Sequence, residues 1–276
     1  MLKVAFQGEI VAYSEEAVHS FFNNSIQSVP YMTLSEVFCA VERYVVDGAV
    51  VPIENSLEGS VNQTYDLFLD SSLMVKGELN LRIRHCLIAL PSTSLSDIET
   101  IYSHPQALGQ CRRFLEELKC EAISTYDTAG SVRMLNEKKI RNAGAIASER
   151  AAGIYKLKVL KRDIQDNLYN YTRFFLISHS DAEPSGDDKT SIVFSLKHVP
   201  GALYKALEEF ATRDLNLTKI ESRPTRQKPW EYNFYLDFEG HRKDDKCKKA
   251  LEELEKQAAF LKVLGSYPRA KDKKGL

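Results

Sequence analysis

The sequence predicts an α/β protein in which two α/β lobes are followed by a smaller ferredoxin-like unit of βαββαβ order. Over residues 1–180, short apolar runs alternate with amphipathic helical patterns, which is typical of α/β folds with mostly parallel sheets. The segment 79–90 is long for one strand, so we expect it to carry the chain from a first sheet into a second. The polar stretch 181–188 is expected to be a linker, because it contains Pro184 and Gly186 and the order of elements changes after it.

Local signals define the elements of the first 180 residues. Ser14 is placed to cap a helix over 14–23 whose first turn is acidic. Thr33 and Glu36 have capping-box spacing and begin a second helix, which we expect to stop at Gly48. The other expected strands are 2–6, 49–53, 98–102, 122–124 and 143–147, and the other expected helices are 105–118, 128–138 and 148–155.

The region 189–276 has its own order of elements. Strands are expected at 190–196, 217–222, 232–238 and 260–267, with helices at 200–213 and 242–257. This order is the ferredoxin-like split arrangement. Before it, the chain is expected to cross between the lobes near 79–90 and again near 160–177, which would leave a ligand cleft between them.

Composition and charge argue against several classes of protein. Lys and Arg number 37 against 38 Asp and Glu, a net charge of −1, so the chain offers no electrostatic footprint for nucleic acid. The five cysteines include no Cys-x-x-Cys pair and the histidines are scattered, so we expect reduced thiols and no metal site. No stretch reaches the roughly 20 apolar residues of a membrane span, and the first residues enter a strand at once. We therefore expect a cytoplasmic protein with no membrane partner.

Five loops between a strand and the following helix are unusually polar: 7–14, 52–61, 103–108, 126–131 and 145–148. Helix N-termini present free N–H groups, so several of them around one cleft would bind a small dianion. Alternatively, Ser14, Asp127 and Ser148 simply cap their own helices. The loops carry more polar residues than helix capping needs, which favours the anion-binding site. The additional residues are Asn55, Ser56, Gln106 and Thr128. His104 has two interpretations, a cap before Pro105 or a polar group facing the cleft.

The segment 170–177 reads as a strand that carries a hydroxyl and a guanidinium side by side, Thr172 and Arg173. Neighbouring side chains of a strand point to opposite faces, so the two can share one wall only if the strand ends or bends there. A proton donor beside an anion-binding Arg suits chemistry on a carboxylate. The alternative is an ordinary strand with an Arg at its edge.

In the last unit, two segments have the composition of a site for a small zwitterion. Gly201, Ala202 and Leu203 begin a helix, where small residues let a ligand reach the terminus. The run 221–224, Glu221-Ser222-Arg223-Pro224, ends a strand with opposite charges that would suit an ammonium and a carboxylate. The alternative is an edge strand that Pro224 terminates.

Together these segments resemble the prephenate dehydratase family, which includes the arogenate dehydratases. The matching residues are Pro52 to Ser56 with Gly59 and Val61, Ser103 to Leu108, Asp127 to Ala129, Ile146 to Ser148, Asn170, and Thr172 to Phe174. Residues 201–203 and 221–224 resemble the motifs of the ACT regulatory domain of that family. The resemblance covers nearly the whole chain, with several motifs in order.

The resemblance implies a two-lobed catalytic domain like type 2 periplasmic binding proteins, with a small-molecule substrate between the lobes. It implies conversion of prephenate to phenylpyruvate with loss of water and carbon dioxide, without a metal or organic cofactor. The essential threonine of the family falls on Thr172, and Arg173 with the helix N-termini is expected to hold a substrate carboxylate. The implied substrate-binding residues are Asn55, Ser56, Gly59, His104, Gln106, Thr128, Ser148, Asn170, Arg173 and Phe174.

The resemblance also implies phenylalanine as an effector. We expect it to bind where two ACT units pair, so that the protein is a homodimer or homotetramer. The implied effector-binding residues are Gly201, Ala202, Leu203, Glu221, Ser222, Arg223 and Pro224.

Two departures from the family pattern and two alternatives remain. Val11 stands where the first loop usually carries a second Gly, and Val tolerates positive φ badly, so we expect a differently shaped loop. Tyr204 follows the Gly-Ala-Leu motif where Val is usual, and its bulk is expected to alter effector binding. The alternatives in function are an arogenate dehydratase and, in another class, a sensor that binds a ligand without catalysis.

Overall fold

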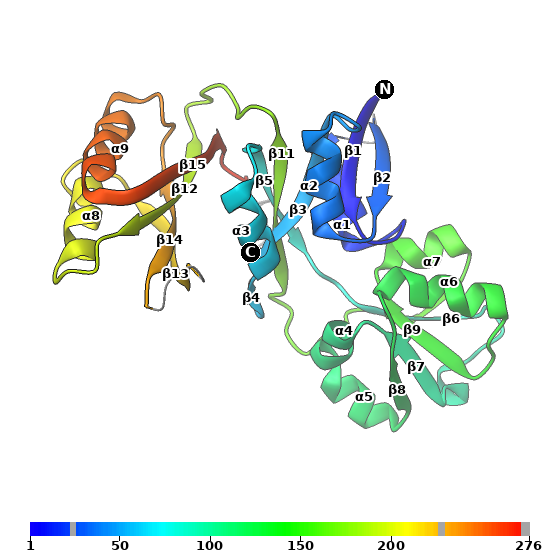
Figure 1. The fold of residues 1–276 in the computed structure, drawn as a ribbon. Helices are drawn as coiled ribbons and strands as arrows, with labels where there is room; N and C mark the ends of the chain where they lie inside the picture. The colour runs from blue at the N-terminus through cyan, green and yellow to red at the C-terminus, as the bar shows by residue number, and fades with distance from the viewer. Residues whose placement is uncertain (23–25, 226–229, 272–276) are drawn as a thin grey trace.

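The computed structural model describes residues 1–22, 26–225 and 230–271, which form three sheets with their helices. Asn23, the expected end of the first helix, and residues 272–276 of the last unit lie outside the described residues. The first lobe lies between the second lobe and the C-terminal unit (Figure 1). None of the described helices is both long and apolar enough to cross a membrane.

The first lobe is a six-stranded sheet of order β2-β1-β3-β11-β5, with the short β4 paired to β3. Its strands are β1 (Leu2–Gln7), β2 (Ile26–Tyr31), β3 (Gly48–Asn55), β4 (Gly59–Ser60), β5 (Met74–Arg82) and β11 (Tyr171–Ser178). Its helices are α1 (Tyr13–Phe22), α2 (Leu34–Glu42) and α3 (Asn62–Asp70). Strands β2, β1 and β3 are parallel, but β11 runs antiparallel to both β3 and β5.

The second lobe is a five-stranded sheet of order β10-β6-β9-β7-β8. Its strands are β6 (Cys86–Ala89), β7 (Thr100–Ser103), β8 (Glu121–Ser124), β9 (Ala143–Ala147) and β10 (Lys158–Lys161). Its helices are the short 3-10 helix η1 (Leu95–Asp97), α4 (Pro105–Gln110), α5 (Arg112–Leu118), α6 (Thr128–Lys138) and α7 (Glu149–Tyr155). The expectation of mostly parallel sheets is therefore wrong. Both lobes are mixed because a strand next to a crossing runs opposite to its neighbours: β6, by which the chain enters the second sheet, and β11, by which it returns to the first.

The segment expected as one long strand, 79–90, is the end of β5 in the first sheet followed by β6 in the second. The chain returns after β10 and enters the first sheet again at β11, so residues 83–85 and 162–170 join the lobes. These two joining segments are hydrogen-bonded to each other, from Ile83 N to Asn170 O (2.8 Å) and from Ile164 N to His85 O (3.1 Å).

The C-terminal unit is an antiparallel sheet of order β13-β14-β12-β15. Its elements are β12 (Asp188–Leu196), α8 (Ala202–Ala211), β13 (Leu217–Pro224), β14 (Tyr232–Glu239), α9 (Asp245–Gln257) and β15 (Ala258–Pro268), in the expected βαββαβ order. One face packs on α8 and α9, and Figure 1 shows the other face turned toward the first lobe.

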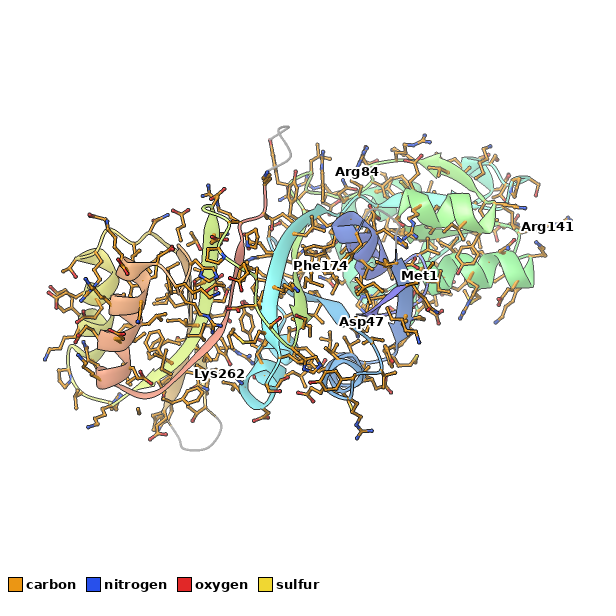
Figure 2. All side chains as sticks on the ribbon, turned by 90° about the horizontal axis from the view of Figure 1, so that it is seen from above. Met1, Asp47, Arg84, Arg141, Phe174 and Lys262 are labelled. Carbon is orange, nitrogen blue, oxygen red and sulfur yellow. The ribbon has the colours of Figure 1, made fainter. Side chains whose placement is uncertain are left out.

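The C-terminal unit and the first lobe share one hydrophobic core. Val193, Tyr235 and Leu264 belong to the same buried cluster as Val51 and Phe175 of the first lobe. The burial of this apolar surface stabilises the docked arrangement at about 25 cal/mol for each Å² removed from water. From above, Phe174 lies near the middle of the molecule, Lys262 on the side of the C-terminal unit and Arg141 at the far end of the second lobe (Figure 2).

Candidate active site

A pocket of about 320 Å³ contains residues from both lobes and from the segments that join them. Its lining residues are Gln7, Gly8, Ala12, Tyr13, Ser14, Pro52, Asn55, Ile83, His85, His104, Gln106, Ala107, Gln110, Tyr126, Asp127, Thr128, Thr172 and Phe174. Most of them come from four of the five polar loops that the sequence singled out, and the others are Ile83, His85, Gln110, Thr172 and Phe174. The pocket therefore has the dimensions and polar walls that a small ring acid requires.

Strand alternation on β11 decides which of its side chains reach the pocket. Thr172 and Phe174 line it, and Arg173 between them points to the opposite face of the sheet. The register of β11 against β3 shifts between Arg173 and Phe174, but this irregularity does not bring Arg173 to the pocket side.

Arg173 is committed elsewhere, which corrects the expectation that it holds a substrate carboxylate. Its guanidinium lies 2.5 Å from Asp237 Oδ2 and 2.6 Å from Glu78 Oε2, and its side chain is 12% exposed. Burial opposes the charged form, but Asp237, Tyr267 and Glu78 outweigh it and hold the pKa of Arg173 well above its ordinary value. The expectation failed because side chains alternate along β11, which places Arg173 on the face opposite the pocket. Buried carboxylates lie on that face and bind the guanidinium.

The Thr172 hydroxyl is oriented by Asn55. Asn55 Nδ2 donates to Thr172 Oγ1 at 3.0 Å, and Asn55 Oδ1 accepts from the backbone N–H groups of Leu57 and Glu58 at 3.0 Å each. The two backbone donors fix which end of the carboxamide faces Thr172. Because Thr172 Oγ1 accepts this hydrogen bond, its own proton is free to point into the pocket.

Besides Arg173, four of the expected substrate-binding residues do not line the pocket. Asn170 is fully buried behind Asn55, which donates to its Oδ1 at 2.8 Å. Ser56 Oγ donates to Tyr169 O, and Ser148 Oγ accepts from Ala151 N as the cap of α7. Gly59, the first residue of β4, has φ +80° and pairs with Asn55. We therefore correct the contact expectation for these residues, whose roles here are to shape or cap local structure.

Fixed N–H groups are the main positive features of the pocket. None of its lining residues is Lys or Arg. The N-termini of α1 and α6 reach it through Tyr13, Ser14 and Thr128, and a helix N-terminus carries a partial positive charge. An anion would therefore be held by backbone dipoles and by polar side chains.

His104 satisfies both interpretations that the sequence left open. Its Nδ1 accepts from Gln106 N at 3.3 Å as the cap of α4, and its side chain lines the pocket. Gln106 and Thr128 also line the pocket, together with Asn55, Thr172 and Phe174. The predicted helix 105–118 is interrupted at Cys111, which lies at φ −117° and ψ 24° between α4 and α5.

Sequence reasoning missed three side chains that the structure brings to the site: Tyr13, His85 and Gln110. His85 is 2% exposed and lies in the first joining segment. Its signal in the sequence was weak, because the same segment also carries Asn80, Arg82 and Arg84 and only the fold shows which of these polar side chains is buried and needs partners. Gln110 gave a weaker signal, as one more polar residue on a helix. Among the described residues, no group of three or more His, Cys, Asp or Glu side chains is arranged to hold a metal ion.

Comparison with known proteins identifies the family. The family model of prephenate dehydratase matches residues 4–182, and that of the ACT domain matches residues 190–256. The chain belongs to the prephenate dehydratase family. The bifunctional chorismate mutase/prephenate dehydratase of Aquifex aeolicus is 45% identical over 271 residues, covering 98% of this chain and 74% of that protein. Arogenate dehydratase/prephenate dehydratase 2 of Arabidopsis thaliana is 45% identical over 278 residues, covering 97% of this chain and 73% of that protein.

Solved structures agree with the fold. A prephenate dehydratase from Arthrobacter aurescens in complex with L-Phe has a TM-score of 0.90 at 33% identity, covering 100% of this chain and 92% of that chain. GqqA, a quorum quenching acylase, has a TM-score of 0.88 at 33% identity, covering 98% of each chain. The two-lobed catalytic domain with a C-terminal ACT domain is thus confirmed.

The two motif segments of the ACT domain have different surroundings: one begins a helix, and the other contacts the catalytic domain. Gly201 caps α8 with φ +78°, and Ala202 and Leu203 form the first turn of that helix. Glu221 accepts a hydrogen bond from Ser60 Oγ, and Arg223 lies 2.9 Å from Asp66 Oδ1.

Glu221 and Arg223 therefore already have partners on the catalytic domain in this structure. The exposed residues of this segment are Ser222 and Pro224. The expectation that both charges face a zwitterion stays a prediction, and it now requires these contacts to be replaced.

Proposed function

We propose that this protein converts prephenate to phenylpyruvate, water and carbon dioxide, as a carbon–oxygen lyase of phenylalanine biosynthesis. The observation that carries the proposal is the Thr172 hydroxyl, which lines the pocket and accepts from Asn55 Nδ2 at 3.0 Å. Family membership over residues 4–182 supports the reaction class.

Prephenate is a cyclohexadiene dianion with a carboxylate and a hydroxyl across the ring. The ring carbon–oxygen bond breaks and the proton of Thr172 goes to the departing hydroxide, which leaves as water. The carbon–carbon bond to the ring carboxylate breaks, its electron pair completes the aromatic ring, and carbon dioxide departs. Thr172 regains a proton from solvent. Its hydroxyl is a weak acid, so position and fixed dipoles contribute more than acidity.

The remaining substrate groups suit the other walls of the pocket. The side-chain carboxylate is held by the N-termini of α1 and α6, where N–H groups and helix dipoles favour an anion. Phe174, which is 2% exposed, packs under the ring. The ring carboxylate is bound without a cationic side chain, so the pocket stabilises it weakly and favours its loss as a neutral gas.

The proposal includes regulation by phenylalanine at the ACT domain, in a homodimer or homotetramer formed by pairing of ACT domains. A family relative crystallised with L-Phe supports this effector. Coupling of about 1–3 kcal/mol between the two sites would suffice. We also propose a cytoplasmic location, which the five free cysteines support.

The test is an assay of phenylpyruvate absorbance with purified protein and prephenate. Thr172→Ala is expected to lower kcat at least about a hundredfold with the fold retained, because the proton donor is lost. Thr172→Ser is the control, because it keeps the hydroxyl. A folded Thr172→Ala protein with the normal rate would refute the assignment, and so would absence of turnover in the parent protein, which is the outcome expected of a sensor.

Arogenate is the second substrate to assay, because the Arabidopsis thaliana relative bears both substrate names. Arogenate carries an amino group where prephenate has a keto group, and one polar contact can decide between them. A kcat/KM for arogenate above that for prephenate would make the protein an arogenate dehydratase.

An acylase activity is a further candidate, because GqqA has the same fold. Acyl transfer by a hydroxyl requires an adjacent base. Among the described pocket hydroxyls, that of Tyr13 contacts a histidine ring, at 3.0 Å from His85 Nδ1. Burial, followed by the charges of Glu16, Cys86 and Cys111, raises the pKa of Tyr13 well above its ordinary value and disfavours a phenolate nucleophile. We therefore rank amide hydrolysis below dehydration.

A further inference from the structure

A continuous chain of side-chain hydrogen bonds ends at the Thr172 hydroxyl. His85 Nε2 lies 2.9 Å from Gln110 Oε1, and Asn170 Nδ2 donates to the same oxygen at 2.8 Å. Asn170 Oδ1 then accepts from Asn55 Nδ2 at 2.8 Å, which in turn donates to Thr172 Oγ1 at 3.0 Å. The catalytic hydroxyl is thus connected to a buried histidine through three carboxamides.

The direction of every hydrogen bond in this chain is determined. Backbone N–H groups occupy Asn55 Oδ1, so the amino end of Asn55 faces Asn170 and Thr172. Asn170 must then present its oxygen to Asn55 and its amino group to Gln110. Gln110 Oε1 already accepts from Asn170, so an attractive contact with His85 requires a proton on Nε2 of the ring. Each step follows from the inventory of donors and acceptors.

At the other end of this chain of hydrogen bonds, contacts of both its backbone and its ring fix the position of His85. Its backbone N–H donates to Gln165 Oε1 at 2.9 Å, and its backbone oxygen accepts from Ile164 in the second joining segment. Its Nδ1 lies 3.0 Å from the hydroxyl of Tyr13, at the start of α1. The ring is therefore at the junction of the two lobes, where it contacts groups from both.

Burial lowers the pKa of His85, although its hydrogen bond with Gln110 opposes the shift. In a neutral ring with its proton on Nε2, Nε2–H donates to Gln110, and Nδ1 is an acceptor that shares the single Tyr13 proton with Arg84 O, which lies 2.7 Å from the same hydroxyl. Both ring nitrogens of His85 thus contact protein groups.

We propose that His85 is a positioning residue for the dehydration. Its Nε2–H fixes the Gln110 carboxamide, and through Asn170 and Asn55 it keeps the Thr172 proton directed into the pocket. This inference rests on the proposed role of Thr172. It also links the junction of the lobes to the reacting hydroxyl, because Gln110 belongs to the second lobe and Asn55 to the first.

Two substitutions separate positioning from simple structural support. In His85→Gln the amide nitrogen reaches the place of Nε2 and can donate to Gln110. In His85→Asn the amide occupies the place of Nδ1, so the contact with Tyr13 survives and the donor to Gln110 is lost. We expect His85→Asn to lower kcat by about 10- to 100-fold with KM changed by less than about threefold, because the reacting group is misplaced. His85→Gln should stay within about threefold of the parent kcat.

A double-mutant cycle tests whether His85 acts through Thr172. In the Thr172→Ala background, His85→Asn should change kcat by less than about threefold, because the hydroxyl that it positions is gone. Equal losses of kcat in His85→Asn and His85→Gln would overturn the inference. So would an undiminished effect of His85→Asn in the Thr172→Ala background. A normal rate in Thr172→Ala itself would refute the proposed function, whatever the His85 variants do.

A measurement on the unaltered protein covers the case in which His85→Asn does not fold. Ring ¹⁵N chemical shifts of labelled histidines distinguish the two neutral tautomers, and the His85 signals are assigned by their absence in His85→Gln. We expect a neutral ring with its proton on Nε2 at pH values above about 7. A proton on Nδ1 would reverse the direction of the chain and overturn the inference.

Discussion

Val11 adopts a backbone conformation that β-branched residues rarely take. Its φ is +76°, and a non-glycine residue in that region costs about 1–3 kcal/mol. The side chain is 1% exposed and belongs to the hydrophobic cluster of the second lobe that includes Ala129 and Val132. Its N–H donates to Glu15 Oε2 at 2.7 Å. Val11 thus adopts the positive φ that a valine was expected to avoid, and packing against the second lobe offsets the strain; a loop shaped differently from that of the family stays a prediction.

We therefore expect an unusual order of stability at position 11. Val11→Ala should lower the free energy of unfolding by about 1–2 kcal/mol, because it removes buried methyl groups and keeps the positive φ. Val11→Gly removes more surface but relieves the strain, so it should be no less stable than Val11→Ala. The control is Val132 on α6, where Gly should be about 1 kcal/mol worse than Ala. The midpoints of urea unfolding compare the stabilities of all four variants. The same difference between the Gly and Ala variants at both positions would contradict the argument.

His85 makes stability depend on pH. Burial lowers its pKa below the ordinary value, so the unfolded chain takes up a proton before the folded protein does as the pH falls. The neutral ring therefore costs no stability above about pH 6.5, and the free energy of unfolding decreases as the pH falls from 6.5 toward the folded pKa. The neighbouring Tyr13 has a raised pKa and Gln110 does not titrate, so neither changes charge in this window.

The measurement is the free energy of unfolding between pH 5 and 8 for the parent protein and His85→Gln. The difference between them should change by up to about 1.4 kcal/mol per pH unit below pH 6.5 and remain flat above it. Glu16 also has a pKa raised by burial, but its contribution is common to both proteins and cancels. Parallel curves for the two proteins would refute the assignment.

At the scale of the elements, the sequence predicted most helices and strands because capping and periodicity are local signals. The capping box of Thr33 and Glu36 is present, and α6 has the predicted bounds. However, α2 ends at Glu42 rather than near Gly48, which begins β3. The strands β2 and β10 were missed because each is short or partly exposed and lies at a sheet edge.

The candidate site was predictable in its loops but less so in its individual contacts. Motif loops such as the one that contains Asn55 lie where a strand gives way to a helix, so their polar residues stood out. Arg173 could not be placed, because its partners Glu78 and Asp237 are brought to its face of β11 only when the sheet forms and the ACT domain docks. His85 and Gln110 escaped because their partners lie far away in the sequence, up to 72 and 60 residues in their hydrogen bonds to Tyr13 and Asn170.

The docking of β15 on β5 depends on a glycine. Gly265 has φ +155°, and a Cβ built there would lie 2.2 Å from Val75 O. Gly265→Ala is therefore expected to push the two strands apart and to lower the midpoint of thermal unfolding by several degrees. The control is Gly109→Ala in α4, whose Cβ meets nothing within 4 Å and which should be neutral or stabilising by up to about 1 kcal/mol. Calorimetry measures the midpoint of thermal unfolding of both variants, and equal midpoints would contradict the prediction.

At the scale of the whole molecule, the sheet of the first lobe separates the active site from the ACT domain. On β3, Asn55 faces Thr172, while the neighbouring Glu54 lies 3.0 Å from Lys219 of the ACT domain. On β11, Thr172 lines the pocket, while Arg173 pairs with Asp237 of the ACT domain. Each strand thus presents one residue to the reaction and the next to the regulatory domain.

Lys219 is the ACT side chain best placed to carry the effector signal. Its Nζ also lies 3.2 Å from Glu221 Oε2, within the predicted effector segment, and its side chain is 11% exposed. A change at Glu221 therefore alters the partner of Glu54, one residue from Asn55. Lys219 is largely buried, although Glu54 and Glu221 are 35% and 27% exposed, so salt screens these pairs in part and a rearrangement of them can still bias the pocket.

Lys219→Met keeps the aliphatic stem and removes the charge that joins Glu54 to Glu221. We expect phenylalanine to bind the variant within about threefold of its parent affinity in equilibrium dialysis. Its effect on kcat/KM, about 5- to 150-fold for coupling of 1–3 kcal/mol, should fall below about twofold. The control is Lys243→Met, which breaks an exposed ion pair with Glu183 and should leave the response intact. A full response in Lys219→Met would exclude this route, and an equal loss in Lys243→Met would show that the loss does not depend on the pair with Glu54.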